Sequence, residues 1–402
     1  MIRSLDLKTA SGALPRAARP ARLLASGDFR DFSGLWPRSC DRSEARFYAF
    51  QCAELIELRL QTAIAARGGE PRFVAVLGED DAPLALMAFS IERERYSRFA
   101  PDAATLRFLD GGLADYNAPV LYPAAAHWDA PTRRRVWRAA LRILPPVDFA
   151  VLEKMPERVV DLPNPLHALS QYRFGVSGHG AKLPENWAEF SARLPHRKNW
   201  KTGRFRALGP VTLEIATTPE RYGEIVEVLI AQKRRRYLQT WGSDGLARPG
   251  YLDYLRGAAR LAYPNGPACL FALKAGEAVI AANLGLKTGE RFNGQFTTYD
   301  DGAWAEFSPG ALLMNKVVEW CHAAGVRILD FGIGDDRYKA SYCDIDIPLY
   351  QAEIAVSRRA RFAVQARRVA LWARDLRRRT SGSERRTASA PLESPGDKAA
   401  RK

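Results

Sequence analysis

Cysteine and histidine are scarce in this chain of 402 residues. There are five of each, widely separated, and neither a C-x-x-C pair nor an H-E-x-x-H segment occurs. Zinc sites and disulfide frameworks require such residues at close, regular spacings. We therefore expect free thiols in a reducing compartment and no bound metal.

Long apolar stretches are also absent. The longest runs, at 82–91 and 279–286, are too short to cross a bilayer. Residues 1–22 scatter basic side chains among Ala and Pro, without the compact apolar segment of a signal peptide. These features predict a cytoplasmic protein. Hydrophobic residues still make up 47% of the chain, which is enough to build a buried core.

Acidic residues are too few to balance the basic ones, and the net charge is +15. Most of this excess lies at the two ends. Residues 357–402 carry a net charge of +10 and residues 1–22 a net charge of +4, which leaves +1 for residues 23–356. A protein that binds nucleic acid with its folded body concentrates positive charge there. The distribution therefore argues against nucleic acid as a partner.

The predicted elements follow the same order in both halves of the chain. The first half contains a helix, three strands, a helix and a strand, at 44–66, 73–77, 84–91, 106–109, 131–144 and 148–152. The second half contains a strand at 211–216, helices at 219–237 and 251–263, strands at 268–274, 278–286 and 291–299, a helix at 309–324, and strands at 327–332 and 349–356. A strand, a crossing helix and another strand form a parallel pair. We expect an α/β (α+β) fold with an internal duplication.

These patterns divide the chain into four parts. Residues 1–22 are expected to be a flexible basic tail, 23–180 and 181–356 the two lobes, and 357–402 a basic helix with a disordered end. The segment 164–195 contains several prolines and is expected to connect the lobes.

The predicted C-terminal helix is amphipathic. Arginines surround one apolar face, which carries Phe362, Ala366, Val369, Ala373 and Leu376. Such a helix either lies in the interface of an anionic membrane or packs on its own domain. Both interpretations stay open.

Ser308-Pro309-Gly310-Ala311 is the clearest candidate for ligand binding. Ser308 suits a helix N-cap, Pro309 suits the first helical position, and Gly310 allows a ligand to approach the backbone. The free N–H groups of a helix start attract phosphate or carboxylate groups. The alternative is an ordinary capped helix.

The second candidate is the segment D-F-G-I-G-D-D-R-Y-K, from Asp330 to Lys339. It places a carboxylate near the end of a strand, where ligands collect in open α/β sheets. A carboxylate there can act as a general base. The alternative is a polar surface loop in which Lys339 pairs with Asp335.

Three segments together resemble the CelD-like proteins linked to polysaccharide synthesis. They are the run from Phe307 to Tyr342 with S-P-G-A-L-L and D-F-G-x-G-D-D-x-Y-K, the basic segment 194–200, and L-D-G-G-L-A-D-Y-N-A-P at 109–119. The resemblance covers about residues 30–356. It implies a tandem fold of the GNAT acyltransferase superfamily, related to the Fem-type aminoacyltransferases.

The resemblance also implies roles for particular residues. The donor would be acyl-CoA, with its pyrophosphate at Ser308, Pro309, Gly310 and Ala311. The base would be Asp330 or Glu306, and Lys339 or Tyr338 would position the substrate or the oxyanion. Substrate contacts would come from Asp115, Tyr116, His196, Arg197, Lys198, Asn199 and Tyr299. The chain lacks the [QR]-x-x-G-x-[GA] loop common in GNAT enzymes, so acyl-CoA rests on the resemblance alone.

We therefore expect an N- or O-acyltransferase that acts on an amine or hydroxyl, in exopolysaccharide or cell-envelope glycan synthesis. Two alternatives remain. One is a Fem-type transferase that uses aminoacyl-tRNA, against which the near-neutral body argues. The other is a non-catalytic factor of polysaccharide assembly.

Overall fold

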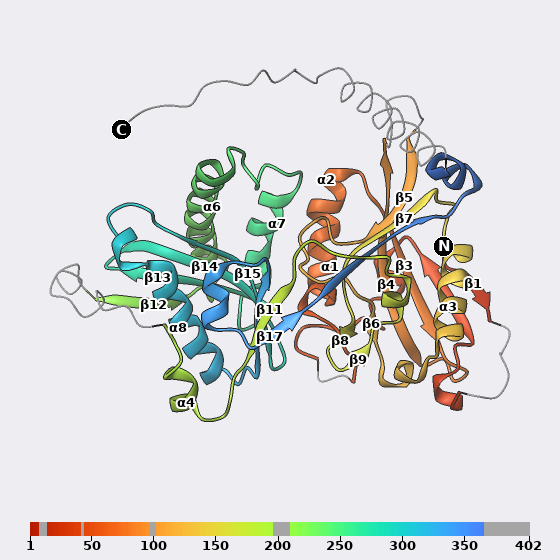
Figure 1. Cartoon of the computed structure of the whole chain (residues 1–402), viewed down its shortest axis with the longest axis horizontal. Helices are drawn as coiled ribbons and strands as arrows, with labels where there is room; N and C mark the ends of the chain where they lie inside the picture. Colours follow the sequence, from red (N-terminus) through yellow and green to blue (C-terminus); the bar gives the residue numbers. More distant parts are fainter. Residues whose placement is uncertain (8–13, 42–43, 96–101, 196–209, 366–402) are drawn as a thin grey trace, which may run out of the picture. The chain divides into compact units, whose positions relative to one another are not determined.

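The computed structural model describes residues 1–7, 14–41, 44–95, 102–195 and 210–365 (Figure 1). Met1–Ile354 form one compact unit, which contains both main sheets, and Ala355–Lys402 form a second unit. In the second unit Phe362 is 77% exposed, and the rest of the predicted amphipathic face lies outside the described residues. Within the described ranges, no helix combines the length and the apolarity needed to cross a membrane.

The first lobe is built on a nine-stranded sheet in the order β1-β2-β3-β4-β5-β7-β18-β10, with β6 paired to β4. Its strands are β1 Arg3–Asp6, β2 Arg22–Ser26, β3 Glu70–Leu77, β4 Pro83–Glu94, β5 Ala103–Phe108, β6 Val120–Leu121, β7 Phe149–Pro156, β10 Tyr172–Arg173 and β18 Leu349–Ala355. A separate small ladder joins β8 Arg158–Val159 to β9 Leu162–Pro163.

Two helical segments pack on this sheet. One runs through α1 Ala53–Arg59, the π-helical turn Leu60–Ile64 and α2 Ala65–Arg67, and the other is α3 Ala130–Ile143. The first segment buries Ile56 and Ile64 in one cluster with residues of β3 and β4. Short 3-10 turns occur at Arg16–Ala18, Phe29–Asp31, Ala49–Gln51, Pro123–His127 and Pro165–Leu169.

The second lobe is built on a seven-stranded sheet in the order β12-β13-β14-β15-β16-β11-β17. The strands are β11 Gly178–Lys182, β12 Val211–Ile215, β13 Ala268–Ala275, β14 Ala278–Thr288, β15 Arg291–Tyr299, β16 Ile328–Ile333 and β17 Ile345–Ile347. The helices are α4 Trp187–Ser191, α6 Pro219–Trp241, α7 Tyr251–Gly257 and α8 Pro309–Ala323, with 3-10 turns η8 Ala258–Leu261, η9 Ala305–Phe307 and η10 Arg337–Ser341.

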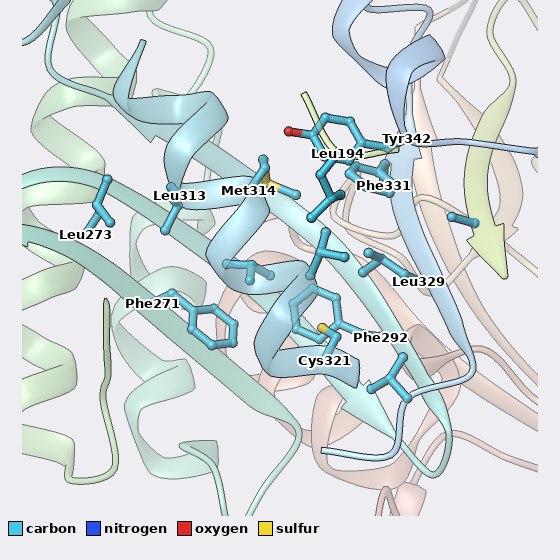
Figure 2. Close-up of a cluster of buried hydrophobic side chains, with 14 of the residues drawn as sticks. Leu194, Phe271, Leu273, Phe292, Leu313, Met314, Cys321, Leu329, Phe331 and Tyr342 are labelled. Carbon is cyan, nitrogen blue, oxygen red and sulfur yellow. The ribbon is translucent and has the colours of Figure 1, made fainter. Parts of the chain in front are cut away.

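Helix α8 covers one face of this sheet. Its buried side chains Leu313 and Cys321 belong to one cluster with Phe271, Phe292 and Leu329 of β13, β15 and β16 (Figure 2). Helix α6 packs against β13, β14 and β15 as well, yet none of its buried residues belongs to this cluster. The two helices therefore cover opposite faces, and α8 is held by burial of apolar surface.

The predicted duplication is confirmed. In the first lobe β5 and β7 are parallel and joined across α3, and in the second β15 and β16 are parallel and joined across α8. The β15–β16 ladder spans only Arg291–Asn293 and Ile328–Asp330, although β15 continues to Tyr299. The two strands thus stop pairing beyond Asn293 and Asp330.

The predicted helix over 44–66 is wrong in its first part, because α1 begins at Ala53. Arg46 instead exchanges backbone hydrogen bonds with Leu121, at 2.7 and 2.9 Å, which holds this stretch extended. A pairing with a residue so distant in sequence outweighs local helical periodicity.

Three further expectations about the ends of the lobes are wrong. The strand over 349–356 was expected to close the second half, but β18 lies in the first sheet. The expected connection 164–195 contains β11, which pairs with β16 and β17 in the second sheet. Residues 1–22, expected as a flexible tail, contain β1, which pairs with β2. An alternating pattern predicts a strand but not its partner, so the exchange between the lobes could not be predicted.

Candidate active site

Tyr116 of the segment 109–119 and Asp330 of the D-F-G segment are in contact, although 214 residues separate them in the sequence. The Tyr116 hydroxyl of the first lobe donates a hydrogen bond to Asp330 Oδ1 of β16, at 2.8 Å. Tyr116 is fully buried, and its ring lies 4.8 Å from that of Tyr48. Gly178 of β11 makes room for it, because a Cβ there would lie 2.0 Å from the Tyr116 oxygen.

Asp330, the first candidate base, is almost completely enclosed. It is 1% exposed, accepts a 2.7 Å hydrogen bond from the Gly332 N–H, and its Oδ2 has no hydrogen-bond partner among the described residues. Burial raises the pKa of Asp330, while the Gly332 and Tyr116 hydrogen bonds oppose that rise. Its contacts are therefore with protein groups that fix the end of β16.

Asp115 is the more accessible carboxylate of the pair, since it is only partly buried. Its Oδ2 lies 2.6 Å from where a Gly332 Cβ would stand. Burial, together with repulsion from Asp330, raises the pKa of Asp115 to about 7, against the attraction of Lys154 and Lys339. A carboxyl group with this pKa can accept a proton near neutral pH.

Gly332 is required by its backbone as well as by this contact. Its φ is +74°, in the left-handed region that side-chain-bearing residues seldom adopt. A side chain would also collide with Asp115 and with the carbonyl of Gly294, 2.8 Å from the Cβ position. The glycine of the D-F-G segment thus lets the two carboxylates approach the same strand end.

Lys339 lies beneath this strand end. Its Nζ donates hydrogen bonds to the carbonyls of Gly332 and Ile333, at 3.0 and 2.9 Å, and the residue is 3% exposed. Burial lowers the pKa of Lys339, while Asp336, Asp115 and Asp330 favour its charged form. The described contacts make Lys339 a support of the β16 end.

Tyr338, by contrast, is 42% exposed. Desolvation and the nearby Asp336 carboxylate raise the pKa of the Tyr338 hydroxyl, so this group keeps its proton at neutral pH. Tyr338 can therefore donate a hydrogen bond, while its raised pKa makes it a weak acid.

The start of α8 differs from the predicted cap. Ser308 occupies the N-cap position, but with a left-handed φ of +51°, and its side chain makes no cap hydrogen bond. Pro309 is the first helical residue as predicted. No side chain occupies the helix end. The Ser308 and Ala311 N–H groups donate to backbone carbonyls and Pro309 has no N–H, so among the described residues of this turn the Gly310 N–H is the one left for a ligand.

Gly310 has a packing role of its own. A Cβ on Gly310 would lie 2.8 Å from a ring carbon of Tyr299 at the end of β15. Any side chain there would displace the ring, so Gly310 variants are poor tests of ligand binding. Ala311, whose N–H bonds back to the Ser308 carbonyl at 3.0 Å, is partly exposed and is the better position.

Of the other predicted residues, Glu306 is exposed on η9, directly before α8. His196, Arg197, Lys198 and Asn199 lie outside the described residues. In the described ranges no three His, Cys, Asp or Glu side chains are grouped so that they could hold a metal ion.

Two basic residues near this site went unnoticed in the sequence. Arg236 of α6 lies 4.6 Å over the Tyr299 ring, and Lys233 donates to the Thr297 carbonyl at 3.1 Å. The run K-R-R-R at 233–236, inside a helix, was the available signal. A cavity of about 240 Å³ lies elsewhere, lined by Arg3, Arg72 and neighbours in the first lobe.

Residues 168–340 match the family model of the acetyltransferase (GNAT) domain. The matched range includes β11, β15, α8, β16 and most of η10. This match supports an acyltransferase domain of GNAT type in the second lobe, a domain that generally binds acetyl-CoA. No curated protein sequence matches the chain.

Several solved structures are similar overall. FemX shares 11% identity, over 80% of this chain and 93% of that chain, with a TM-score of 0.49. A tandem GNAT protein from the clavulanic acid biosynthesis pathway shares 13%, over 83% and 99%, with a TM-score of 0.43. A protein of unknown function from Bacteroides thetaiotaomicron shares 14%, over 82% and 97%, with a TM-score of 0.45. The chain has an α/β fold with two lobes that share one strand–helix–strand arrangement, and most of the second lobe matches the GNAT family model.

Proposed function

We propose that the protein is an acyltransferase that moves an acyl group from acyl-CoA to an amine or hydroxyl, with Asp115 as general base. The observation that carries this proposal is the position of Asp115. Its carboxyl group comes from the first lobe, has a pKa of about 7 and lies against the end of β16, a strand within the range that matches the GNAT family model. General bases work best when their pKa is near the working pH.

The reaction would be direct transfer. Asp115 takes a proton from the acceptor nitrogen or oxygen as that atom attacks the thioester carbonyl. The new bond to the carbonyl carbon forms, and the tetrahedral intermediate then collapses with loss of the C–S bond. The departing thiolate would take its proton from solvent, and Tyr338, protonated and partly exposed, would donate a hydrogen bond to it.

Asp330 and Tyr116 would act through Asp115. The negative charge of Asp330 opposes ionisation of Asp115, which keeps the Asp115 pKa high. Tyr116 holds Asp330 by the 2.8 Å hydrogen bond. Asp330 is therefore a positioning residue in this proposal, and Lys339 supports the strand end on which both carboxylates rest.

The donor would bind where β15 and β16 stop pairing, with its phosphates toward the first turn of α8. Two features support this placement. Beyond Asn293 and Asp330, β15 and β16 no longer pair with each other. The N–H and C=O groups on their facing edges could therefore bind the amide groups of an extended donor molecule. The uncapped start of α8 offers the Gly310 N–H and the positive end of the helix dipole to an anion.

The acceptor would be a glycan or a glycan precursor of the cell envelope, in the cytoplasm or at the inner membrane face. Support for this comes from the three motifs that resemble CelD-like proteins. Thermal unfolding of the full chain with acyl-CoAs of different chain length tests the donor, because a ligand of the folded state must stabilise it. Thiol release with amino-sugar acceptors then tests transfer. No stabilisation by any acyl-CoA would refute the proposed activity.

A further inference from the structure

Three consecutive arginines of α6 differ in what they contact. Arg234 pairs with Asp244 at 2.6 Å, and Arg235 pairs with Asp301 at 3.0 Å. Arg236 has no carboxylate of the described chain within ion-pair distance and lies over the Tyr299 ring instead. An arginine stacked on a ring keeps its N–H donors available at its edges.

Lys233 lies one turn before Arg236 and has no ion pair in the described residues either. It is partly buried, its Nζ donates to the Thr297 carbonyl, and the ring of Tyr237 lies 5.1 Å away. Burial, with repulsion from Arg236 and Lys339, lowers the pKa of Lys233 to about 8. A cation withdrawn from water without a carboxylate partner is unfavourable unless something else supplies the negative charge.

The charged groups that face Lys233 are unbalanced. Arg236 and Lys339 are cationic and disfavour the charged form of Lys233, whereas Asp336, among the described residues, favours it. The Tyr299 ring under Arg236 also lies beside Gly310 in the first turn of α8, where an added Cβ would stand 2.8 Å from it. The positive end of that helix dipole points to the same place. Arg236 and Lys233 thus lie beside Tyr299 and the first turn of α8, and no carboxylate of the described residues is within ion-pair distance of either.

We infer that Arg236 and Lys233 bind a phosphate or diphosphate group of a substrate beside Tyr299. The geometry suits a planar guanidinium that binds two phosphate oxygens while Lys233 contributes a point charge. The inference rests on the proposed function for the identity of the substrate, but not for the existence of the site.

Calorimetric titration of the full chain with inorganic pyrophosphate tests the site directly. The wild type should bind it, and Arg236→Gln should weaken binding about tenfold, the loss expected for one charge-assisted contact. Arg235→Gln removes the same charge one residue away and should leave binding unchanged, because Arg235 is paired with Asp301. No binding by the wild type, or equal loss in both variants, would overturn the inference. Unchanged melting temperatures confirm that the variants are folded.

Two further binding measurements decide whether the phosphate group belongs to the donor or to the acceptor. If the group belongs to the donor, Arg236→Gln weakens binding of acetyl-CoA but not of acetyl-pantetheine, which lacks the phosphates. If it belongs to the acceptor, pyrophosphate still binds when acetyl-CoA is saturating, and still depends on Arg236. A protein that binds pyrophosphate but no acyl-CoA would keep the anion site and refute the proposed activity.

Discussion

The two lobes repeat one arrangement of strands around a crossing helix, but their helices begin differently. In the first lobe the Asp129 side chain caps α3 by accepting the Thr132 N–H at 2.9 Å, and these contacts lower the pKa of Asp129. In the second lobe Ser308 caps α8 with no side-chain hydrogen bond. A carboxylate already occupies the anion position of α3, whereas that of α8 is open.

The lobes also differ beside the strand that follows the crossing helix. In the first lobe Asn117 binds β7: its N–H donates to the Lys154 carbonyl at 3.0 Å, and its Nδ2 donates to the Glu153 carbonyl at 3.2 Å. In the second lobe the Lys339 Nζ donates hydrogen bonds to the carbonyls of Gly332 and Ile333 of β16. One duplicated framework thus carries a capped helix start in the first lobe and an uncapped one in the second, where we propose that the donor binds.

Core truncation should have the largest effect and tests whether the lobes are separable. Phe292→Ala in the second lobe and Phe73→Ala in the first should each cost about 3–5 kcal/mol, because both rings are fully buried. Since β18 and β11 exchange between the lobes, each change should shift a single transition. Urea unfolding followed by circular dichroism and by tryptophan fluorescence checks this. Two separate transitions would show that the lobes fold independently.

Loss of the proposed base should lower the rate of transfer by about 10²–10⁴-fold. In the wild type the rate should rise with pH to a plateau, with a midpoint near the Asp115 pKa of about 7. Asp115→Asn should remove that rise, as measured by thiol release across pH. A wild-type midpoint unchanged in Asp115→Asn would assign the titration to another group.

The raised pKa of Asp115 also predicts how the free energy of unfolding changes with pH. Because folding raises the Asp115 pKa, its neutral form is favoured in the folded state. The wild type should therefore lose stability relative to Asp115→Asn as pH rises from about 4 to about 7, between the ordinary and the raised pKa. Parallel melting curves at each pH measure the difference, and a constant difference would contradict the raised pKa.

Loss of the Tyr116–Asp330 hydrogen bond between the lobes should lower the free energy of unfolding by an intermediate amount. Tyr116→Phe leaves Asp330 buried without one of its donors, which should cost about 1–3 kcal/mol. Tyr172→Phe, at a 57% exposed position, is the matched control and should change little. Equal free energies of unfolding for both variants would mean that the Tyr116 hydroxyl does not hold Asp330.

Removing the N-cap side chains of α3 and α8 should have the smallest effect on stability, and the effect should differ between the two helices. Asp129→Ala should cost about 1 kcal/mol, the usual loss of a side-chain cap. Ser308→Ala should cost no more than a few tenths, because no side-chain cap bond is lost. Chemical denaturation of both variants gives the comparison, and a larger loss for Ser308→Ala would contradict the open helix end.

Much of the fold could be predicted because local patterns determine it. Strand β15 and helix α8 lie close to where periodicity and the S-P-G segment put them. The extended backbone at Arg46 and the place of β18 could not be predicted, since both depend on partners far away in sequence. In the site, the sequence points to the segments of Asp115 and Asp330, but it predicts Asp330 or Glu306 as the base and Asp115 as a substrate contact. Only the fold shows that Asp330 is enclosed and that Asp115 is the accessible carboxylate.

The central claim is that the donor phosphates bind the open start of α8. Binding of acetyl-CoA to Ala311→Glu, compared with Ala130→Glu at the start of α3, tests it most directly. A glutamate in the first turn suits either helix, so both variants should fold. The account predicts that Ala311→Glu loses acetyl-CoA binding, because its carboxylate takes the anion position, while Ala130→Glu binds like the wild type. Equal affinity in a folded Ala311→Glu protein would contradict it.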